Sequence, residues 1–326
     1  MTRKTSVVIP YYQEDPGILR DAVISAVAQE GVTDLEIIVV DDGSPAPARY
    51  DLEGLDLPAY VTLKLIEQPN RGPGAARNRA LDSVSPGTVY VAFLDSDDRW
   101  TANHLRSAQC ALREDCGFYF ADVWMTTYES TRFSKQNMRL DQHALIDVAQ
   151  NLYGFHRGFD RNSFEIMRFV HTSTIVFPFQ ALSALRFREE FFIGEDAVFC
   201  FELVKRSRKI TFSANVGCIT GRGIHIWQDS GWDSSRAIWR LCHDIRWRKW
   251  LGKNRLRLSE EIDENKKQIN RLRKEFALNL LHEMRNKRAF RNPDIMRFFK
   301  TDPAAVLCAW HVAAQEILKK IRGRRF

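Results

Sequence analysis

The sequence predicts an α/β protein built on a mostly parallel, doubly wound sheet, with a helical appendage at its C-terminal end. Short apolar runs, typical of strands buried on both faces, alternate with segments of helical periodicity over the first hundred residues. Beyond residue 233 the sequence changes to long charged segments of helical period. We therefore expect two parts, residues 1–233 and residues 234–326.

Four strands and two helices are expected in the first hundred residues. The strands are Ser6–Pro10, Leu35–Val40, Val61–Glu67 and Val89–Leu94. Pro10 should end the first strand, because proline has no backbone N–H to donate to a ladder. One helix should open at Pro16 and Gly17 and run to Gln29, and a second should lie within Gly72–Val84.

Polar turns follow three of these strands. The turns are Pro10–Glu14, Asp41–Ser44 and Asp95–Asp98. Because ligands of a doubly wound sheet lie outside the carboxyl ends of its strands, we expect the three turns to share one binding site. The Asp-x-Asp spacing of Asp95 and Asp97 suits Mg²⁺ or Mn²⁺, with substrate phosphates completing the coordination. Taken alone, that spacing is more typical of a solvated acidic turn, and the surrounding turns are what favour a metal site.

The glycine-rich stretch Gly72–Ala76 resembles the start of a dinucleotide-binding loop. Arg77 stands where the third glycine is required, and Pro73 stiffens the turn, so an NAD-type site is not expected. We expect Arg77 to offer its positive charge to a phosphate near the same sheet edge.

Residues 191–199 combine an acidic pair with apolar residues at helical spacing. Glu195 or Asp196 should therefore stand in the first turn of a helix, where the helix dipole favours a carboxylate. From these residues alone, a helix cap and a general base are both open. The stretch His171–Pro178 predicts a polar edge followed by a strand.

Residues 234–326 are strongly basic. They contain 24 Lys and Arg against 10 Asp and Glu, whereas the first 233 residues contain 24 against 31. Aromatic and basic side chains interleave in 237–251, and helices are expected at Glu260–Asn286 and Ala304–Ile321. Such a surface fits peripheral contact with an anionic membrane, and packing on the first part or in a homodimer is the alternative. No nucleic-acid partner is expected, because no recognisable binding module occurs.

The cysteines and the start of the chain predict a cytoplasmic protein. Six cysteines show no metal-type or paired spacing, which is typical of reduced core thiols. The first residues lead directly into a strand-like run, so we expect no secretory signal peptide. No apolar run reaches the ~18 residues that a membrane-spanning helix needs.

Four ordered motifs resemble those of family 2 glycosyltransferases of the GT-A fold. They are Ser-Val-Val-Ile-Pro-Tyr-Tyr-Gln-Glu (6–14), Ile-Ile-Val-Val-Asp-Asp-Gly-Ser (37–44), Asn-Arg-Gly-Pro-Gly-Ala-Ala-Arg-Asn (70–78) and Phe-Leu-Asp-Ser-Asp-Asp (93–98). The resemblance implies an inverting, metal-assisted transfer of a sugar from a nucleotide diphosphate, usually a UDP-sugar. It also implies that 1–233 is the catalytic domain, with a nucleotide-binding half at 1–100 and an acceptor half at 101–233.

The resemblance assigns roles to residues at matching positions. The nucleoside should be bordered by Pro10, Tyr12, Glu14 and Asp42, with Asp42 accepting from the uracil ring. Arg77 should lie near the nucleotide end of the site. Asp95 and Asp97 should serve the ribose, the diphosphate and the metal, Asp97 as the direct metal ligand.

On the acceptor side, the Glu-Asp pair resembles the family's base motif. Asp196 takes the role of general base, with Glu195 as the second choice. His171, Thr172 and Ser173 are expected to line the acceptor pocket. His225, in a glycine-flanked loop with Arg222, is the candidate that closes over the diphosphate or reaches the metal, although a structural histidine is as consistent with this sequence.

Two other classes of function were compared with glycosyl transfer. A sugar-1-phosphate nucleotidyltransferase should carry a glycine-rich basic loop after the first strand, where this chain has Pro10-Tyr-Tyr-Gln. A non-catalytic nucleotide-sugar-binding relative should lack Asp196 or the Asp95–Asp97 pair. The opening motif is similar to that of bacterial exopolysaccharide, succinoglycan-type glucosyltransferases. That similarity implies UDP-glucose as donor, a lipid-linked saccharide repeat unit as acceptor, and a place at the inner face of the cytoplasmic membrane.

Overall fold

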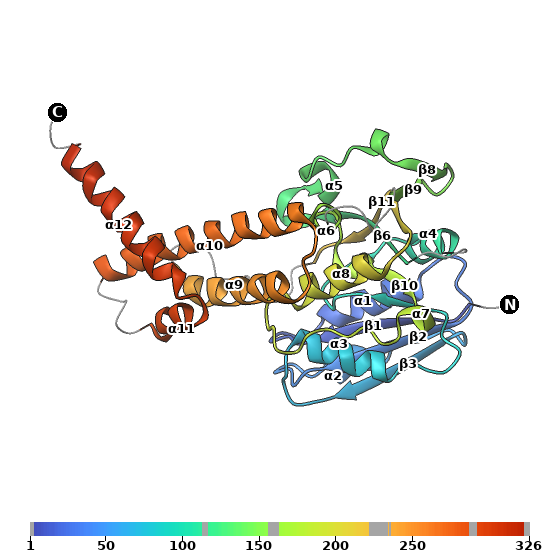
Figure 1. Ribbon diagram of the computed structural model, residues 1–326. Helices are drawn as coiled ribbons and strands as arrows, with labels where there is room; N and C mark the ends of the chain where they lie inside the picture. The colour runs from blue at the N-terminus through green and yellow to red at the C-terminus, as the bar shows by residue number, and fades with distance from the viewer. Residues whose placement is uncertain are drawn as a thin grey trace. The chain divides into compact units, whose positions relative to one another are not determined.

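The computed structural model describes residues 3–112, 117–155, 163–221, 234, 236–286 and 292–322, with side chains as far as residue 315. The chain divides into two compact units (Figure 1). The first comprises Met1–Glu190 with Glu195–Ile224, and the second comprises Phe191–Gly194 with His225–Phe326. The boundary expected at residue 233 falls outside the described residues.

One mixed sheet forms the first unit. Within the described residues its strands follow the order β3-β2-β1-β4-β10-β6-β11-β9-β8, with β5 paired to β11 and β7 paired to β6. The strands of the amino-terminal half are β1 (Thr5–Tyr11), β2 (Leu35–Asp41), β3 (Val61–Glu67) and β4 (Tyr90–Phe93). They are parallel, with β1 between β2 and β4. The predicted parallel arrangement of these four strands is confirmed.

Pro10 does not end the first strand, contrary to the expectation. β1 continues to Tyr11, and Pro10 pairs in register with Val40 of β2. The reason lies on the other side of the strand, where pairing with β4 reaches only Val8. Proline is tolerated at this position because the ladder that would need its N–H has already stopped.

Helices cover both faces of this sheet, as a doubly wound fold requires. Helices α1 (Ile18–Val27) and α4 (His104–Ala111) contribute to one hydrophobic core, and α3 (Pro73–Asp82) and α8 (Glu195–Arg206) contribute to the other. Alternate residues of β1 serve the two cores: Val7 packs in the first and Val8 in the second. This alternation explains why β1 is a continuous apolar run.

The later half of the first unit adds antiparallel strands. β10 (Val176–Pro178) runs antiparallel to both β4 and β6 (Phe118–Met125), and β11 (Ile210–Ile219) is parallel to β6. The strand predicted within 171–178 is thus present. The other elements are α2 (Ala48–Leu52), β5 (Arg99–Trp100), η1 (Thr126–Tyr128), β7 (Ser130–Thr131), α5 (Arg132–Lys135), η2 (Leu140–Gln142), β8 (Ala144–Asp147), β9 (Leu152–Phe155), α6 (Ser163–Met167), η3 (Thr172–Thr174) and α7 (Phe179–Leu182).

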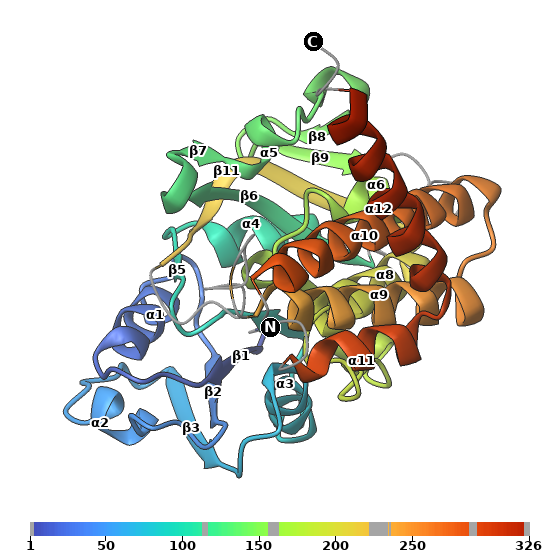
Figure 2. The same ribbon diagram turned by 90° about the vertical axis from the view of Figure 1, so that its left-hand side faces the viewer.

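The second unit is helical in its described part, as predicted. Its helices are α9 (Ala237–Asn254), α10 (Ser259–Arg285), α11 (Pro293–Thr301) and α12 (Ala304–Arg322). α9 and α10 run side by side (Figure 2) and enclose an apolar core that includes Leu241, Phe276 and Phe298. The buried carboxylate of Asp302 joins α9 and α10 through Lys249 (3.2 Å) and Arg273 (2.6 Å). Among the described residues, no helix is long and apolar enough to cross a lipid bilayer.

Candidate active site

The turns that follow β1, β2 and β4 lie together at the carboxyl edge of the sheet. Gln13 connects all three, because its backbone N–H donates to Oγ of Ser44 (2.7 Å) and its side-chain amide donates to Oγ of Ser96 (3.3 Å). No local pattern around residue 13 predicts this role for Gln13. The structure therefore brings the polar turns into one place at the edge where a doubly wound sheet binds its ligand.

Asp42 holds the start of α3. Its Oδ1 accepts from the Arg71 backbone N–H (2.9 Å) and the Gln68 side-chain amide (2.7 Å), and its Oδ2 accepts from the Gly72 N–H (2.7 Å). The residue is 3% exposed. The preceding Asp41 makes a similar pair of bonds to the N–H groups of Ser44 and Ala48. Both acids therefore fix the backbone at the edge of the expected nucleoside site.

The other expected nucleoside neighbours differ in exposure. Pro10 is buried within β1, whereas Tyr12 is 40% exposed and Glu14 is exposed at the same edge. Tyr11, between them, is directed inward, where its hydroxyl donates to the Ala46 carbonyl (2.8 Å). The aromatic ring presented to solvent at this edge is therefore that of Tyr12.

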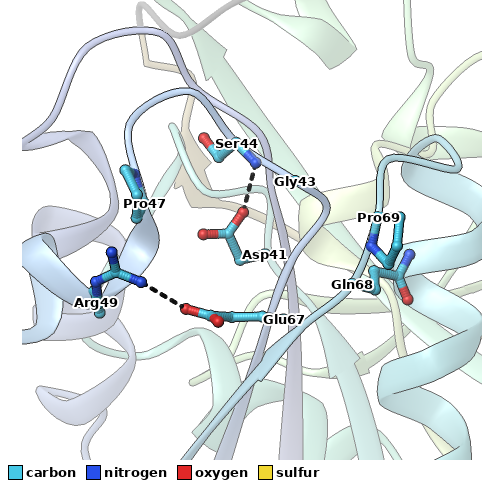
Figure 3. Close-up of a pocket in the computed structure, with 8 residues that line it drawn as sticks. All are labelled: Asp41, Gly43, Ser44, Pro47, Arg49, Glu67, Gln68 and Pro69. Carbon is cyan, nitrogen blue, oxygen red and sulfur yellow. Dashed lines mark hydrogen bonds and ion pairs between the residues drawn. The ribbon is translucent and has the colours of Figure 1, made fainter.

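A pocket of about 360 Å³ opens at the ends of β2 and β3 (Figure 3). Its lining is formed by Asp41, Gly43, Ser44, Pro47, Arg49, Glu67, Gln68 and Pro69. Figure 3 shows Arg49 directed at Glu67 across the pocket, at 3.3 Å. The pocket adjoins the Asp42 turn, but it does not include the acids that follow β4, so it represents one end of the candidate site.

Arg77 is the centre of a buried charge cluster. Its Nη2 donates to Asp95 (2.7 Å) and its Nη1 donates to Glu195 (3.0 Å), and the residue is 5% exposed. Burial opposes the charge of the guanidinium, yet the two carboxylates hold its pKa above the ordinary value. Burial also opposes ionisation of Asp95, but Arg77 outweighs it and lowers the pKa of that carboxyl. Arg77 therefore cross-links α3, the β4 turn and α8, a setting different from the phosphate contact that was expected.

Glu195 and Asp196 occupy contrasting environments at the start of α8. Glu195 is 5% exposed, and burial together with the neighbouring Asp196 raises its pKa to about 8. One guanidinium bonds both the buried Glu195 and the partly exposed Asp95, and the ionised form is favoured at Asp95. Asp196, by contrast, is exposed, with one oxygen accepting from the Ala197 N–H (2.7 Å). Of the two, Asp196 is the carboxylate that a substrate can reach.

Asp98, the third acid of the turn, has a structural role. Its Oδ2 accepts from the Ser173 hydroxyl (2.6 Å) and its Oδ1 from the Gly221 N–H (3.1 Å). The Ser173 hydroxyl oxygen also accepts from the Asp95 N–H (3.1 Å), and the Ser173 carbonyl accepts from the Trp100 indole (2.5 Å). Asp98 is 3% exposed, so these bonds fix the acidic turn against η3 and the end of β11.

Asp97, like Asp95, is a partly exposed acid of the turn. A Cβ added at Gly221 would lie 1.5 Å from its carbonyl oxygen, so only glycine fits beside it. Among the described residues, no group of three or more His, Cys, Asp or Glu side chains is placed to hold a metal ion. Carboxylate oxygens of Asp97 and Asp95 are donors suited to Mg²⁺ or Mn²⁺, which commonly takes only one or two protein carboxylates and completes its shell with phosphates. His225 and Arg222 lie outside the described residues.

His171 stands beside the same acids. Its Nδ1 accepts from the Ser173 N–H (3.4 Å) and lies 3.8 Å from Asp98. Burial and the charge of Arg132 lower its pKa to about 4, although Asp95, Asp97 and Asp196 act in the opposite direction. The imidazole is therefore neutral at physiological pH.

Comparison with known proteins gives consistent similarities. Residues 6–186 match the profile of the family described as Glycosyl transferase family 2. The succinoglycan biosynthesis protein ExoW of Rhizobium meliloti (strain 1021) is 33% identical over 251 residues, 72% of this chain and 74% of that protein. The UDP-Glc:alpha-D-GlcNAc-diphosphoundecaprenol beta-1,3-glucosyltransferase WfgD of Escherichia coli is 34% identical over 100 residues, 31% of this chain and 37% of that protein. The crystal structure of S. aureus TarS 1–349 with UDP-GlcNAc superposes with a TM-score of 0.52 at 18% identity, covering 92% of this chain and 91% of that one.

Proposed function

This chain belongs to glycosyl transferase family 2, and on that premise we propose that it is an inverting, metal-dependent hexosyltransferase that moves glucose from UDP-glucose to a lipid-linked saccharide. The predicted GT-A fold is confirmed by the likeness to TarS, and the chain is related to exopolysaccharide glycosyltransferases. The proposal rests on one observation above all. Exposed Asp196 follows directly on Glu195, which Arg77 joins to Asp95 in the acidic turn.

The donor is proposed to bind along the carboxyl edge of the sheet. The uridine lies against Tyr12 and Glu14, above the buried Pro10, with Asp42 as acceptor for the uracil ring. The exposure of the Tyr12 ring supports this placement, because an aromatic side chain in solvent offers a stacking surface. Oδ2 of Asp42 accepts one bond, from the Gly72 N–H, and its second lone-pair region leaves acceptor capacity for the uracil ring.

The diphosphate is proposed to lie at Asp95 and Asp97. These residues would hold Mn²⁺ or Mg²⁺ together with the diphosphate oxygens, Asp97 as the direct ligand, and we keep His225 as a further ligand candidate. When bound, such an ion stabilises the negative charge that develops on the departing nucleoside diphosphate. Arg77 keeps Asp95 ionised and in place, so its contribution to donor binding is indirect.

Asp196 is proposed as the general base. The acceptor hydroxyl oxygen attacks the anomeric carbon of the sugar, the bond from that carbon to the diphosphate oxygen breaks, and the hydroxyl proton passes to Asp196. A single displacement of this kind inverts the anomeric configuration. The buried, hydrogen-bonded Glu195 positions Asp196 at the helix start. His171 and Thr172, which are partly exposed, line the acceptor side, and the fully buried Ser173 supports them from behind.

The acceptor is proposed to be a lipid-linked exopolysaccharide repeat unit. The name of WfgD, with its UDP-Glc donor and diphosphoundecaprenol-linked acceptor, supports this class of substrate. The charge of 234–326 supports peripheral contact with the inner face of the cytoplasmic membrane. On α12, Leu307 (75% exposed) and Trp310 (73% exposed) add an apolar, aromatic surface of the kind that inserts at an interface. Homodimerisation through the same unit is the alternative use of that surface.

A donor screen tests the proposal. Purified protein is incubated with UDP-glucose, UDP-galactose, UDP-GlcNAc and GDP-mannose, each with Mn²⁺, with Mg²⁺ or with EDTA, in the presence of bacterial polyprenol-linked saccharides. We expect UDP release to be fastest with UDP-glucose and to require the metal, and we expect the product linkage to be opposite in configuration to the donor. Metal-independent turnover, or retention of configuration, would contradict the proposal. Formation of a UDP-sugar from UTP and a sugar phosphate would favour a nucleotidyltransferase.

A further inference from the structure

Arg132 carries a positive charge in the first unit that the proposed reaction does not use. It is the first residue of α5 and is only partly exposed. Its Nε donates to the Arg168 carbonyl (3.0 Å), which fixes the direction of the side chain. Among the residues that the structure describes, no carboxylate lies within ion-pairing distance of its guanidinium, and burial lowers its pKa even though Asp196, Cys200 and Asp122 favour the charged form. The cation is thus partly desolvated, and none of the carboxylates in the described part of the chain forms an ion pair with it.

The surrounding elements place this cation on the acceptor side. Arg168, which accepts from Arg132, directly follows α6, and α6 packs against α8, the helix that begins with Glu195 and Asp196. The charge of Arg132 also acts on the ring of His171, three residues after Arg168. The carboxylates whose charge favours the charged form of Arg132 are those of Asp196 and Asp122, so the guanidinium lies within electrostatic range of the proposed base.

The backbone around Arg132 is held rigidly. Buried Asp122 accepts from the Phe133 N–H (2.9 Å), and the Thr131 hydroxyl oxygen caps α5 by accepting from the Ser134 N–H (3.3 Å). Phe133 is buried in the aromatic core of the first unit. A side chain on such a fixed backbone is pre-organised for binding, because little conformational entropy is lost when a ligand binds.

We propose that Arg132 is the anion-binding residue of an acceptor subsite, and that the acceptor saccharide carries a carboxylate or phosphate group near the hydroxyl that is glycosylated. This deepens the proposed function and rests on it. A partly desolvated guanidinium favours a bidentate carboxylate or phosphate ligand, which supplies the counter-charge that no described residue provides within ion-pairing distance. An acidic group held at Arg132 brings its own sugar ring beside Asp196, where the hydroxyl must lose its proton.

The test measures binding of small sugars to the protein with UDP and Mn²⁺ present, so that the donor side is filled. Glucose, glucuronic acid and glucose 6-phosphate are titrated, and dissociation constants are taken from the rise in the midpoint of thermal unfolding. We expect one or both acidic sugars to bind on the order of tenfold more tightly than glucose. The carboxylate and phosphate arms tell which anion the subsite prefers.

Three variants give the contrast. Arg132→Gln should remove the preference for the acidic sugars, Arg132→Lys should retain part of it, and Arg139→Gln, at an exposed arginine paired with Asp141 (2.9 Å), should leave it unchanged. Circular dichroism and the effect of UDP on the unfolding midpoint show that each variant is folded.

Three results would overturn the inference. These are equal binding of glucose and the acidic sugars by the unmodified protein, an unchanged preference in Arg132→Gln, and a loss of UDP binding rather than sugar binding in Arg132→Gln. If UDP with Mn²⁺ fails to stabilise the unmodified protein, the proposed function itself fails. The sugar titration without nucleotide then still decides whether Arg132 binds anions.

Discussion

Arg77 and Glu195, which are 118 residues apart in the sequence, are hydrogen-bonded at 3.0 Å in the interior of the first unit. Through this contact the start of α8 is fixed to α3, and through Asp95 the same guanidinium reaches the acidic turn after β4. The position of the exposed Asp196 relative to that turn therefore depends on a single buried arginine. Several of the expected effects of mutation follow from this arrangement.

Replacement of Arg77 by alanine should destabilise the protein strongly. It leaves the buried Glu195 and the partly exposed Asp95 without their shared partner, and breaking a buried pair such as Arg77–Glu195 costs about 3–5 kcal/mol of unfolding free energy. Urea unfolding followed by circular dichroism measures the change. Arg71→Ala is the matched control, because Arg71 pairs with Glu189 at 2.7 Å on the surface and should cost no more than about 1 kcal/mol. Equal effects of the two substitutions would contradict the buried role of Arg77.

Glu195 should make the stability of the protein depend on pH. Its pKa is about 8 in the folded state and near its ordinary value of 4.5 in the unfolded state, so the folded state binds the additional proton. The free energy of unfolding should therefore fall as pH rises from about 5 to 8. Glu195→Gln, which cannot titrate, should flatten this slope, whereas Glu67→Gln at an exposed site should not. The measurement is urea unfolding at several pH values, and an unaltered slope in Glu195→Gln would speak against the raised pKa.

Gly221→Ala should disturb the acidic turn from a distance of more than a hundred residues in the sequence. The new Cβ would lie 1.5 Å from the Asp97 carbonyl oxygen, so the backbone at residue 221 and the backbone at Asp97 must move apart. That movement displaces Asp97 relative to the end of β11. We expect a loss of about 1–3 kcal/mol in stability, together with weaker metal-dependent binding of UDP. Gly154→Ala is a suitable control, because its Cβ would meet only the end of the Ile146 side chain at 3.2 Å. Full UDP binding by Gly221→Ala would show that the turn tolerates the displacement.

The sequence predicted the parallel half of the sheet because that half is built from local patterns. β1, β2 and β4 are mostly apolar, and a polar turn follows each of them within two residues. The contacts that complete the site are not local: Ser173 bonds to Asp98 across 75 positions, and Asp98 bonds to Gly221 across 123. A single sequence carries no periodic signal for such pairs. The charge of Arg77 is evident from the sequence, but its burial between two carboxyls depends on α8, which the pattern around residue 77 does not reveal.

Asp97→Ala should separate metal-dependent from metal-independent binding. In the unmodified protein we expect Mn²⁺ to tighten the binding of UDP, and in Asp97→Ala we expect this gain to disappear and transfer to fall by a hundredfold or more, roughly the several kcal/mol that a metal supplies. Calorimetric titration of UDP with and without Mn²⁺ measures the gain in UDP affinity. Asp56→Ala, at an exposed loop position, should behave as the unmodified protein. A metal-dependent gain that survives in Asp97→Ala would assign the metal to other ligands.

Asp196→Asn should abolish transfer while leaving donor binding intact. The amide is nearly the same size as the carboxylate and can still accept from the Ala197 N–H, so the start of α8 should be preserved. It cannot take up the acceptor's proton, and loss of a general base lowers the rate by about 10²–10⁴-fold. UDP affinity by calorimetry and glucose transfer from UDP-glucose are measured on the same preparation, with Glu165→Gln at an exposed position of α6 as control. If Asp196→Asn transfers glucose at the unmodified rate, the base lies elsewhere, and the contrast between exposed Asp196 and buried Glu195 has no part in the chemistry.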